Sequence, residues 1–277
     1  MNLDFLNDPA GFGISESLLQ VSFMSPYWQV MLAGLANTLK VGLPALFLST
    51  VLGVLLGLGQ LASHPLLRRL CRGYVAVFRN IPLLLILLAV YFSITRFLPV
   101  ASEAWSLADL FYLSKSGLAM PALGSGDVPV QGRFAVEGGW LLSPEYLAVL
   151  LALVIYTAAF IAEVVRAGVQ AVKPGMWQAG LALGLTSRQT TRYVMFPLAL
   201  RVVVPSLSNQ YLNLLKNASL GVAVGYPELV SVSNTAINQS GKAAECVFII
   251  LLTYALLSAV AAGLMNLLNR RVNMGAL

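Results

Sequence analysis

The amino-acid sequence predicts an all-α integral membrane protein, and three observations support that prediction. Of the 277 residues, 58% are hydrophobic and only 10% are charged, and the mean hydropathy is +0.80. Soluble domains carry about 25% charged residues, so a chain this apolar needs the lipid bilayer as its solvent. The apolar residues also gather in long stretches, and most basic residues lie in loops at one end of those stretches.

Five segments are apolar and long enough to be membrane-spanning helices, which need roughly 20 residues. They cover about 41–61, 81–98, 146–162, 202–225 and 247–268. The stretch 27–40 is either an interfacial helix or an extension of the first span, and in both cases Lys40 can snorkel to the outer headgroups. Gly53 and Gly57 form a GxxxG pattern, which favours a helix-packing face over a functional role.

The loops between the spans carry opposite charges on the two sides. Basic residues fill the loop before the second span, the loop after the third span and the end of the chain. Every acidic residue except Glu163 falls in the N-terminal segment or in the other loops. Because basic loops stay in the cytoplasm, we predict an outer N-terminus and an inner C-terminus, a parity that five spans allow. The insert 99–145 is then on the outside, and its apolar pieces are compatible with short surface helices.

Other classes of protein are disfavoured by what the sequence lacks. There is no GxxxxGK[ST] pattern for binding ATP. The single histidine, His64, has no neighbours at ligand spacing, so neither a metal site nor a Ser/His/Asp set is expected, and catalysis by this chain alone is not expected. The basic residues fit membrane orientation better than nucleic-acid binding. Cys71 and Cys246 are expected on opposite sides of the membrane and therefore unpaired.

The inner loop 163–197 carries the pattern of two short helices. Pro174 and Gly175 can open the first helix, and Thr186 or Ser187 can cap a second one that runs to Pro197. Small residues recur between them, which allows close packing; they are Ala179, Gly180, Ala182 and Gly184. We therefore predict two short helices joined at a glycine below the bilayer, with an ordinary solvated or re-entrant loop as the alternative.

The fourth span is unusually polar. An ionised lysine at the bilayer centre costs about 2.5–3.5 kcal/mol, so this segment is expected to line a cavity or an interface. Residues at three- and four-residue steps share one helix face. This face either lines a path for a solute, or it packs within a helix bundle while Lys216 pairs there or snorkels. The candidates are Asn209, Asn213, Lys216, Asn217 and Ser219.

Charged residues also gather at the inner end of the third span. Glu163 and Arg166 lie three residues apart, which favours a structural ion pair over a gate. Arg79 follows a basic loop and precedes the second span. It is interpreted as an interfacial anchor, with a contact to a partner subunit as the lesser option.

The inner loop resembles the EAA loop of bacterial ABC importer permeases. That pattern reads E-A-A, three residues, G, nine residues and I-x-L-P. Gln178, Ala179 and Gly180 take the triplet, Gly184 has the expected spacing, and Pro197 closes the pattern. Gln178 replaces the usual Glu, so the resemblance carries the docking role without a carboxylate there. The stretches YTAAFIAEVVRAGVQAV and LLKNASL resemble permeases for polar amino acids, and DFLNDPAGFGISESLL resembles the general L-amino-acid and glutamate/aspartate/glutamine subgroup.

The resemblance implies a type I ABC importer permease fold with five transmembrane helices and cytoplasmic coupling helices. It implies a permease domain at 27–271 in the bacterial inner membrane, a periplasmic N-terminal segment 1–26, a periplasmic insert 99–145 and a cytoplasmic tail 272–277. The ATPase-docking residues would be Gln178, Ala179, Gly180, Gly184, Leu185 and Pro197.

The resemblance also implies partners: an identical or homologous permease, two cytoplasmic ATPases that bind ATP and Mg, and a periplasmic solute-binding protein. The chain would bind no cofactor itself. The expected function is ATP-driven import of polar L-amino acids, of the glutamate/aspartate/glutamine class, by alternating access. The alternative is a self-contained secondary carrier or channel, which needs intramembrane acids; only Glu163 comes close.

Overall fold

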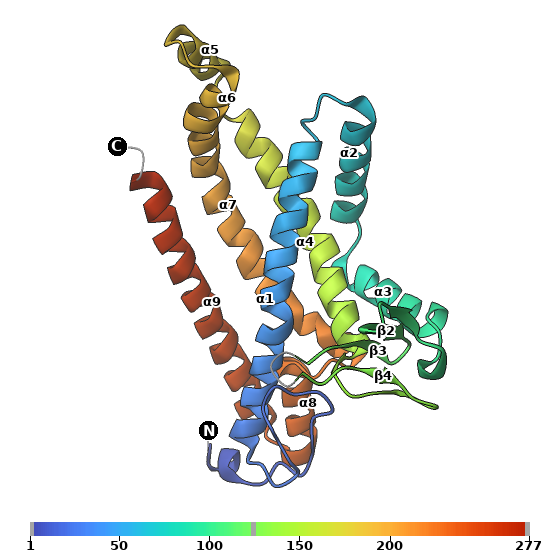
Figure 1. The fold of residues 1–277 in the computed structure, drawn as a ribbon. Helices are drawn as coiled ribbons and strands as arrows, with labels where there is room; N and C mark the ends of the chain where they lie inside the picture. Colours follow the sequence, from blue (N-terminus) through green and yellow to red (C-terminus); the bar gives the residue numbers. More distant parts are fainter. Residues whose placement is uncertain (1–2, 123–125, 275–277) are drawn as a thin grey trace. The chain divides into compact units, whose positions relative to one another are not determined.

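The structure is a computed structural model that describes residues 3–122 and 126–274 and is mostly helical (Figure 1). The chain divides into two compact units, each made from three stretches of sequence. Unit 1 comprises Met1–Ala45, Pro82–Leu153 and Asn217–Ile250, and unit 2 comprises Leu46–Ile81, Val154–Lys216 and Leu251–Leu277. Three long helices cross between the two units, α1 (Tyr27–Gly59), α4 (Pro144–Gln170) and α9 (Ala243–Met274), and α7 (Phe196–Asn217) contributes its last residue to unit 1.

Three of the described helices are long and apolar enough to cross a membrane, namely α1, α4 and α9 as far as Val272. A fourth span is counted if α2 (Pro65–Asn80) and α3 (Leu83–Phe97) form one broken span. The stretch 27–40 is helical and continuous with the first predicted span, so the extension is the correct alternative. The fourth predicted span begins in α7 (Phe196–Asn217) and ends as the 3₁₀ helix η4 (Ala218–Val224).

In unit 1 the N-terminal segment and α8 (Leu229–Ser240) contact the first part of α1. The N-terminal segment holds a short 3₁₀ helix, η1 (Asp4–Asn7), and α8 packs directly on α1. A Cβ placed on Gly34 would lie 3.1 Å from the backbone of Leu229, so glycine permits this approach. The fully buried Glu228 caps α8 by accepting hydrogen bonds from the amides of Val230 and Ser231, at 2.8 and 2.7 Å.

The described residues of the insert 99–145 form β-strands and loops, so the expectation of short surface helices is wrong for them except at the 3₁₀ turn η2 (Ala101–Glu103). A four-stranded antiparallel sheet has the order β1-β2-β3-β6, and β4 pairs with β5 (Figure 1). The strands are β1 (Trp105–Leu107), β2 (Phe111–Ser114), β3 (Gly117–Met120), β4 (Val130–Gln131), β5 (Val136–Glu137) and β6 (Trp140–Leu142). Two consecutive positive φ angles, at Ala108 and Asp109, turn the chain between β1 and β2, which a helix cannot accommodate.

Lys40 has partners within the protein. Its ammonium group forms an ion pair with Glu16 of the N-terminal segment and lies 5.6 and 5.1 Å from the ring centroids of Trp140 and Tyr146. Only 7% of the Lys40 side chain is exposed. A carboxylate and two aromatic faces, all within unit 1, satisfy the charge in place of headgroups.

In unit 2, α1 and α4 pack closely at the predicted glycine pair. A Cβ on Gly53 would lie 2.6 Å from Cβ of Ile161, and a Cβ on Gly57 would lie 2.7 Å from Cβ of Val165. These distances are too short for any other residue, so the prediction of a packing face is confirmed. Ile161 and Val165 also join Val203 of α7 in the apolar core of this unit.

The basic stretch before the second predicted span is the amphipathic helix α2, where the sequence reading gave a loop. Pro65 begins the helix at its first position, which proline favours, and Cys71 and Val75 form its buried side. The Tyr74 hydroxyl donates to the carbonyl of Ile155 at 2.9 Å, which ties α2 to α4. Both Cys71 and Cys246 are buried, free thiols.

Candidate functional site

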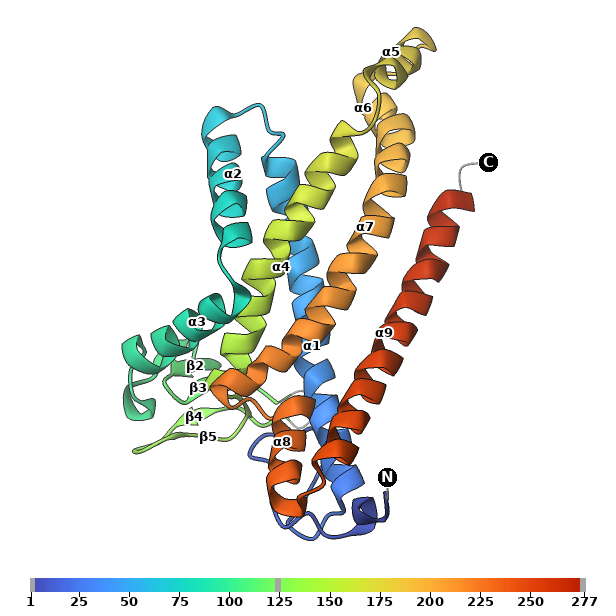
Figure 2. The ribbon, with the colours of Figure 1, turned by 180° about the vertical axis from the view of Figure 1, so that it is seen from behind.

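The candidate site begins with a helical hairpin in unit 2. It consists of α5 (Pro174–Ala182), α6 (Ser187–Thr190) and a π-helical turn, η3 (Thr191–Met195), which leads into α7. In unit 2, α5 and α6 lie beyond the N-terminal end of α7 (Figure 2). The two predicted short helices are therefore present, but the second continues through Pro197 into α7 and does not end there.

The turn between the two helices explains the spacing of the glycine motif. Gly184 has φ of +82°, and its amide bonds to the carbonyl of Leu181 at 3.0 Å, while the amide of Leu185 bonds to the carbonyl of Gly180 at 3.2 Å. These two bonds are the Schellman motif that ends a helix at a left-handed residue, normally glycine. Gly180, Gly184 and Leu185 thus belong to one helix end, which stops α5 and redirects the chain.

Two further contacts close the hairpin. A Cβ on Gly180 would lie 2.6 Å from Cγ2 of the fully buried Thr190, so α5 approaches α6 as closely as a glycine allows. Thr186 caps α6 in a capping box with Gln189, whose side chain accepts from the Thr186 amide at 2.9 Å. The sequence signal for the cap was correct at Thr186.

The hairpin presents exposed side chains at its tip. Gln178 and Ala179 are exposed on α5, and Leu183 in the turn is 82% exposed. The surrounding charges are all basic, because no Asp or Glu occurs from Val164 to Arg201. The exposed cations of this segment are Lys173, Arg188 and Arg192. An apolar tip with a basic rim is suited to a partner surface that is acidic around a hollow.

Pro197 lies at the second position of α7, directly after the π-helical turn. Proline has no amide hydrogen, and its ring clashes with the carbonyl four residues before it in a regular helix. The wider turn, in which the amide of Phe196 bonds to the carbonyl of Thr191, gives the ring room. Pro197 therefore marks where the hairpin joins α7 without breaking the helix.

The polar residues of α7 divide between the two units. In unit 2, Asn209, Asn213 and Lys216 are exposed along one face of the helix, as their spacing predicts. In unit 1, Asn217 is partly buried and lines a cavity of about 10 Å³ with Leu87 and Leu220, which is too small for a solute. Ser219 lies in η4 and is partly buried.

Glu163 and Arg166 form the ion pair that their spacing predicts. The Arg166 Nε donates to Glu163 Oε2 at 3.0 Å, and Nη2 contacts Oε1. The side chains are 28% and 27% exposed. Arg79, in the last turn of α2, places its guanidinium 5.4 Å from the centroid of Phe160, one turn before Glu163 on α4. These three predicted residues lie together in unit 2.

A polar junction in unit 1 was not predicted. The buried Asn37 donates to the carbonyls of Glu16 and Pro227, at 2.7 and 2.9 Å, and the Tyr226 hydroxyl donates to the Asn37 carbonyl at 3.0 Å. Burial raises the pKa of the Tyr226 phenol, with a smaller contribution from the Glu16 charge, so the phenol remains a donor. An asparagine within an otherwise apolar helix was the sequence signal that could have predicted this junction.

The described part of the chain contains no cluster of side chains suited to binding a metal ion. No group of three or more His, Cys, Asp or Glu side chains there could hold an ion. The functional features are instead an exposed hairpin on long apolar helices and a polar face along one of them.

Long apolar helices with an exposed hairpin at their end are the arrangement expected of a helical membrane permease. Residues 49–274 match the family described as binding-protein-dependent transport system inner membrane component, and the chain belongs to that family. It is therefore a multi-pass component of the inner membrane, and its family works with a solute-binding protein and with ATPase subunits that are separate chains.

Similar proteins agree with this family. The general L-amino acid transport system permease protein AapQ of Rhizobium johnstonii is 36% identical, over 97% of this chain and 82% of its own length. The putative amino-acid ABC transporter permease protein YhdX of Escherichia coli is also 36% identical, over 97% and 84%. A crystal structure of an amino acid ABC transporter with histidines is 25% identical, with a TM-score of 0.67 over 88% of this chain and 95% of that one.

Proposed function

We propose that this chain is the permease subunit of an ATP-driven importer of polar L-amino acids. The observation that carries the proposal is the exposed α5–α6 hairpin, in a chain similar to permeases for general L-amino acids and, at 28% identity, to the glutamate/aspartate import permease GltJ of Escherichia coli. The substrate class would be that of glutamate, aspartate and glutamine. The same family membership disfavours the alternative of a self-contained carrier or channel.

The proposed topology has five spans. The second span is α3, as 81–98 predicts, and α7, whose 22 residues are polar on one face, is added to α1, α4 and α9. The charge distribution supports a periplasmic N-terminus and a cytoplasmic C-terminus. The proposed domains are the periplasmic segment 1–26, the permease domain 27–271 with its periplasmic insert 99–145 and cytoplasmic loop 163–197, and the tail 272–277.

The proposed docking surface is the hairpin tip. Gln178 and Ala179 would contact the ATPase, while Gly180, Gly184 and Leu185 would shape the turn and Pro197 would connect it to α7. In this mechanism, closure of the ATP-bound ATPase pair moves the hairpin, and α7 follows because a continuous helical segment joins them. Coupling of this kind requires two states that ATP binds unequally.

The proposed solute path follows the polar face of α7. Asn209, Asn213 and Lys216 are exposed, so a solute or a second permease subunit could meet them. A zwitterionic amino acid needs donors for its carboxylate and acceptors for its amine, and the asparagine amides with the lysine ammonium offer both. Asn217 and Ser219, which belong to unit 1, remain candidates for the path from the sequence alone. Glu163, Arg166 and Arg79 are proposed as a structural cluster at the inner end of α4.

The proposed assembly contains two permeases, identical or homologous, with two ATP-binding subunits, a periplasmic binding protein and the surrounding lipid. ATP and Mg would bind to the ATPase subunits. This chain would therefore contribute the membrane path and the docking hairpin, and the partners would contribute energy and solute capture.

The hairpin turn gives a direct test. Gly184 needs a positive φ, which asparagine tolerates and a β-branched residue does not. We expect Gly184→Val to lower amino-acid uptake and solute-stimulated ATP hydrolysis roughly 5–30-fold, because about 1–2 kcal/mol of strain disfavours the native turn. Gly184→Asn should retain most activity.

The matched control is Gly175→Ala. Gly175 lies in the first turn of α5 with open space around its Cα, and its φ is not in the left-handed region. Its substitution should leave uptake unchanged. Normal coupling in Gly184→Val, at wild-type levels of membrane-inserted protein, would contradict the docking role.

A further inference from the structure

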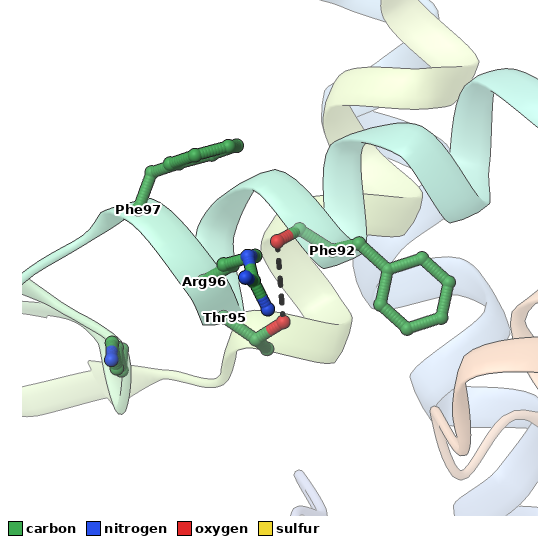
Figure 3. A pocket seen from close by; sticks show the side chains of 5 residues that line it. Phe92, Thr95, Arg96 and Phe97 are labelled. Atoms are coloured by element: carbon green, nitrogen blue, oxygen red, sulfur yellow. Dashed lines mark hydrogen bonds between the residues drawn. The ribbon is translucent and has the colours of Figure 1, made fainter.

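A hollow of about 810 Å³ in unit 1 holds two basic side chains from different elements. It is lined by Phe92, Thr95, Arg96 and Phe97 of α3 and by Lys115 of the turn between β2 and β3. Along α3, Arg96 and Thr95 lie between the rings of Phe92 and Phe97 (Figure 3). The volume is within the range of about 300–1,000 Å³ for small-ligand sites.

The two cations of this hollow lack a counter-charge. No acidic residue lines it, and among the described residues neither Arg96 nor Lys115 forms an ion pair. This differs from Lys40, whose ammonium is paired with Glu16. An anion bound in the hollow would supply the missing counter-charge.

The backbone at each cation belongs to folded structure. The amide of Lys115 donates to the carbonyl of Pro99 at 2.9 Å, which ties the hairpin turn to the chain just after α3. Gly117 fixes the same turn, because its φ is +115° and a Cβ there would collide with the carbonyl of Leu142. Arg96 stands on the exposed side of α3, whose other side is anchored by buried residues such as Leu87 and Ile94.

The walls of the hollow are apolar and exposed. The Phe92 and Phe97 side chains are 60% and 75% exposed, and α3 also exposes Leu84 and Leu85. The Thr95 hydroxyl donates to the carbonyl of Tyr91 at 3.0 Å, so Arg96 and Lys115 are the groups left to donate to a ligand. Aromatic rings beside cations at the end of an apolar helix are typical of the membrane interface, where phosphates meet acyl chains.

We propose that Arg96 and Lys115 bind the phosphate of an anionic phospholipid, with Phe92 and Phe97 contacting its glycerol and acyl groups. The arginine guanidinium can bind two phosphate oxygens at once, and the lysine supplies a second, mobile donor. Placing this site in the outer leaflet rests on the proposed topology. The binding chemistry itself does not depend on transport.

The test uses the full chain, purified in detergent and mixed with phosphatidylglycerol or with phosphatidylcholine, with bound lipid counted by native mass spectrometry. Wild-type protein should retain phosphatidylglycerol in preference to phosphatidylcholine. The double variant R96Q/K115Q should bind phosphatidylglycerol roughly tenfold more weakly, as expected when two charge-assisted contacts to one phosphate are lost.

The matched control is R133Q/K242Q, which removes the same charge from two exposed residues outside the hollow. Its lipid retention should equal that of the wild type. An equal loss in the control, or no loss in R96Q/K115Q, would overturn the site. Displacement of the lipid by inorganic phosphate at matching concentration would make it a site for free phosphate and overturn the lipid assignment.

The lipid experiment needs no ATPase and no amino acid. Failure of solute-stimulated ATP hydrolysis in the Gly184 series would therefore leave the lipid result standing, and a negative lipid result would leave the import proposal standing. The thermal midpoint of each variant shows whether the protein remains folded.

Discussion

Lys40 ties the N-terminal segment of unit 1 to α1 through its ion pair with Glu16. Its ion pair with Glu16 is largely buried, with 7% and 14% of the two side chains exposed. We expect Lys40→Met to lower the free energy of unfolding by about 3 kcal/mol, because it leaves Glu16 as an uncompensated buried carboxylate. Thermal unfolding in detergent, followed by tryptophan fluorescence, measures the change.

The double variant Glu16→Leu with Lys40→Met separates loss of the pair from loss of packing. It should be more stable than Lys40→Met alone, because no buried charge remains. Lys242→Met, at an exposed lysine of the same unit, serves as the control and should unfold like the wild type. A Lys40→Met protein as stable as this control would show that the pair is not needed.

Individual residues differ in how well the sequence predicts their partners. Glu163 and Arg166 are three positions apart on one helix, so helical geometry alone brings their charges together. Glu16 and Lys40 are 24 residues apart, and Glu16 lies in an irregular segment whose course no local rule dictates. The sequence therefore revealed the first pair, while the second required the tertiary structure.

At the scale of elements, Thr186 is the residue that starts α6. Replacing it with alanine removes the hydroxyl of the capping box, which costs about 1 kcal/mol of local helix stability. Amide hydrogen exchange should become faster across α6 and the π-helical turn, while α4 remains protected. Solute-stimulated ATP hydrolysis should fall together with that protection if the hairpin transmits the coupling.

Ser206→Ala is the control for this prediction. It also removes one hydroxyl, but that group only donates to the carbonyl of Val202 within α7, at 3.3 Å. Its exchange rates and coupling should match the wild type. Unchanged exchange in Thr186→Ala would mean that α6 does not depend on its cap.

Elements were predictable where local signals act alone. The hairpin followed from its glycines and its cap, and the packing of α1 on α4 followed from Gly53 and Gly57. The sheet in the insert was missed because its strands are two to four residues long and acquire stability from pairing across the sheet. The basic helix α2 was missed because its arginines indicated a loop, although Pro65 and the spacing of Cys71 and Val75 carried the helical signal.

For the whole molecule, the five-span topology predicts which loops each side of the membrane can reach. In a chain with Cys71 and Cys246 replaced by alanine, we expect a membrane-impermeant maleimide added outside intact spheroplasts to label Lys242→Cys. It should leave Arg188→Cys unlabelled until the membrane is opened. The reverse pattern would contradict the orientation.

That the molecule is a membrane protein was predictable, because a lipid environment selects an apolar amino-acid composition whatever the details of the fold. The window of α9 with the highest apolar character has no buried residue, which is tolerable only where lipid or another subunit covers it. The number of spans was less certain from sequence, because a broken helix pair and the polar helix α7 do not meet the simple rule of length and hydropathy.

The close approach of α1 and α4 in unit 2 limits how that unit can move. At Gly53 and Gly57 the backbone of α1 lies directly against α4, with no side chain of its own between them, and interlocked surfaces of this kind resist sliding and rotation. We therefore expect this pair of helix segments to move as one rigid body during transport. Hinges are then expected where the helical geometry changes, and the first candidate is the π-helical turn that precedes Pro197.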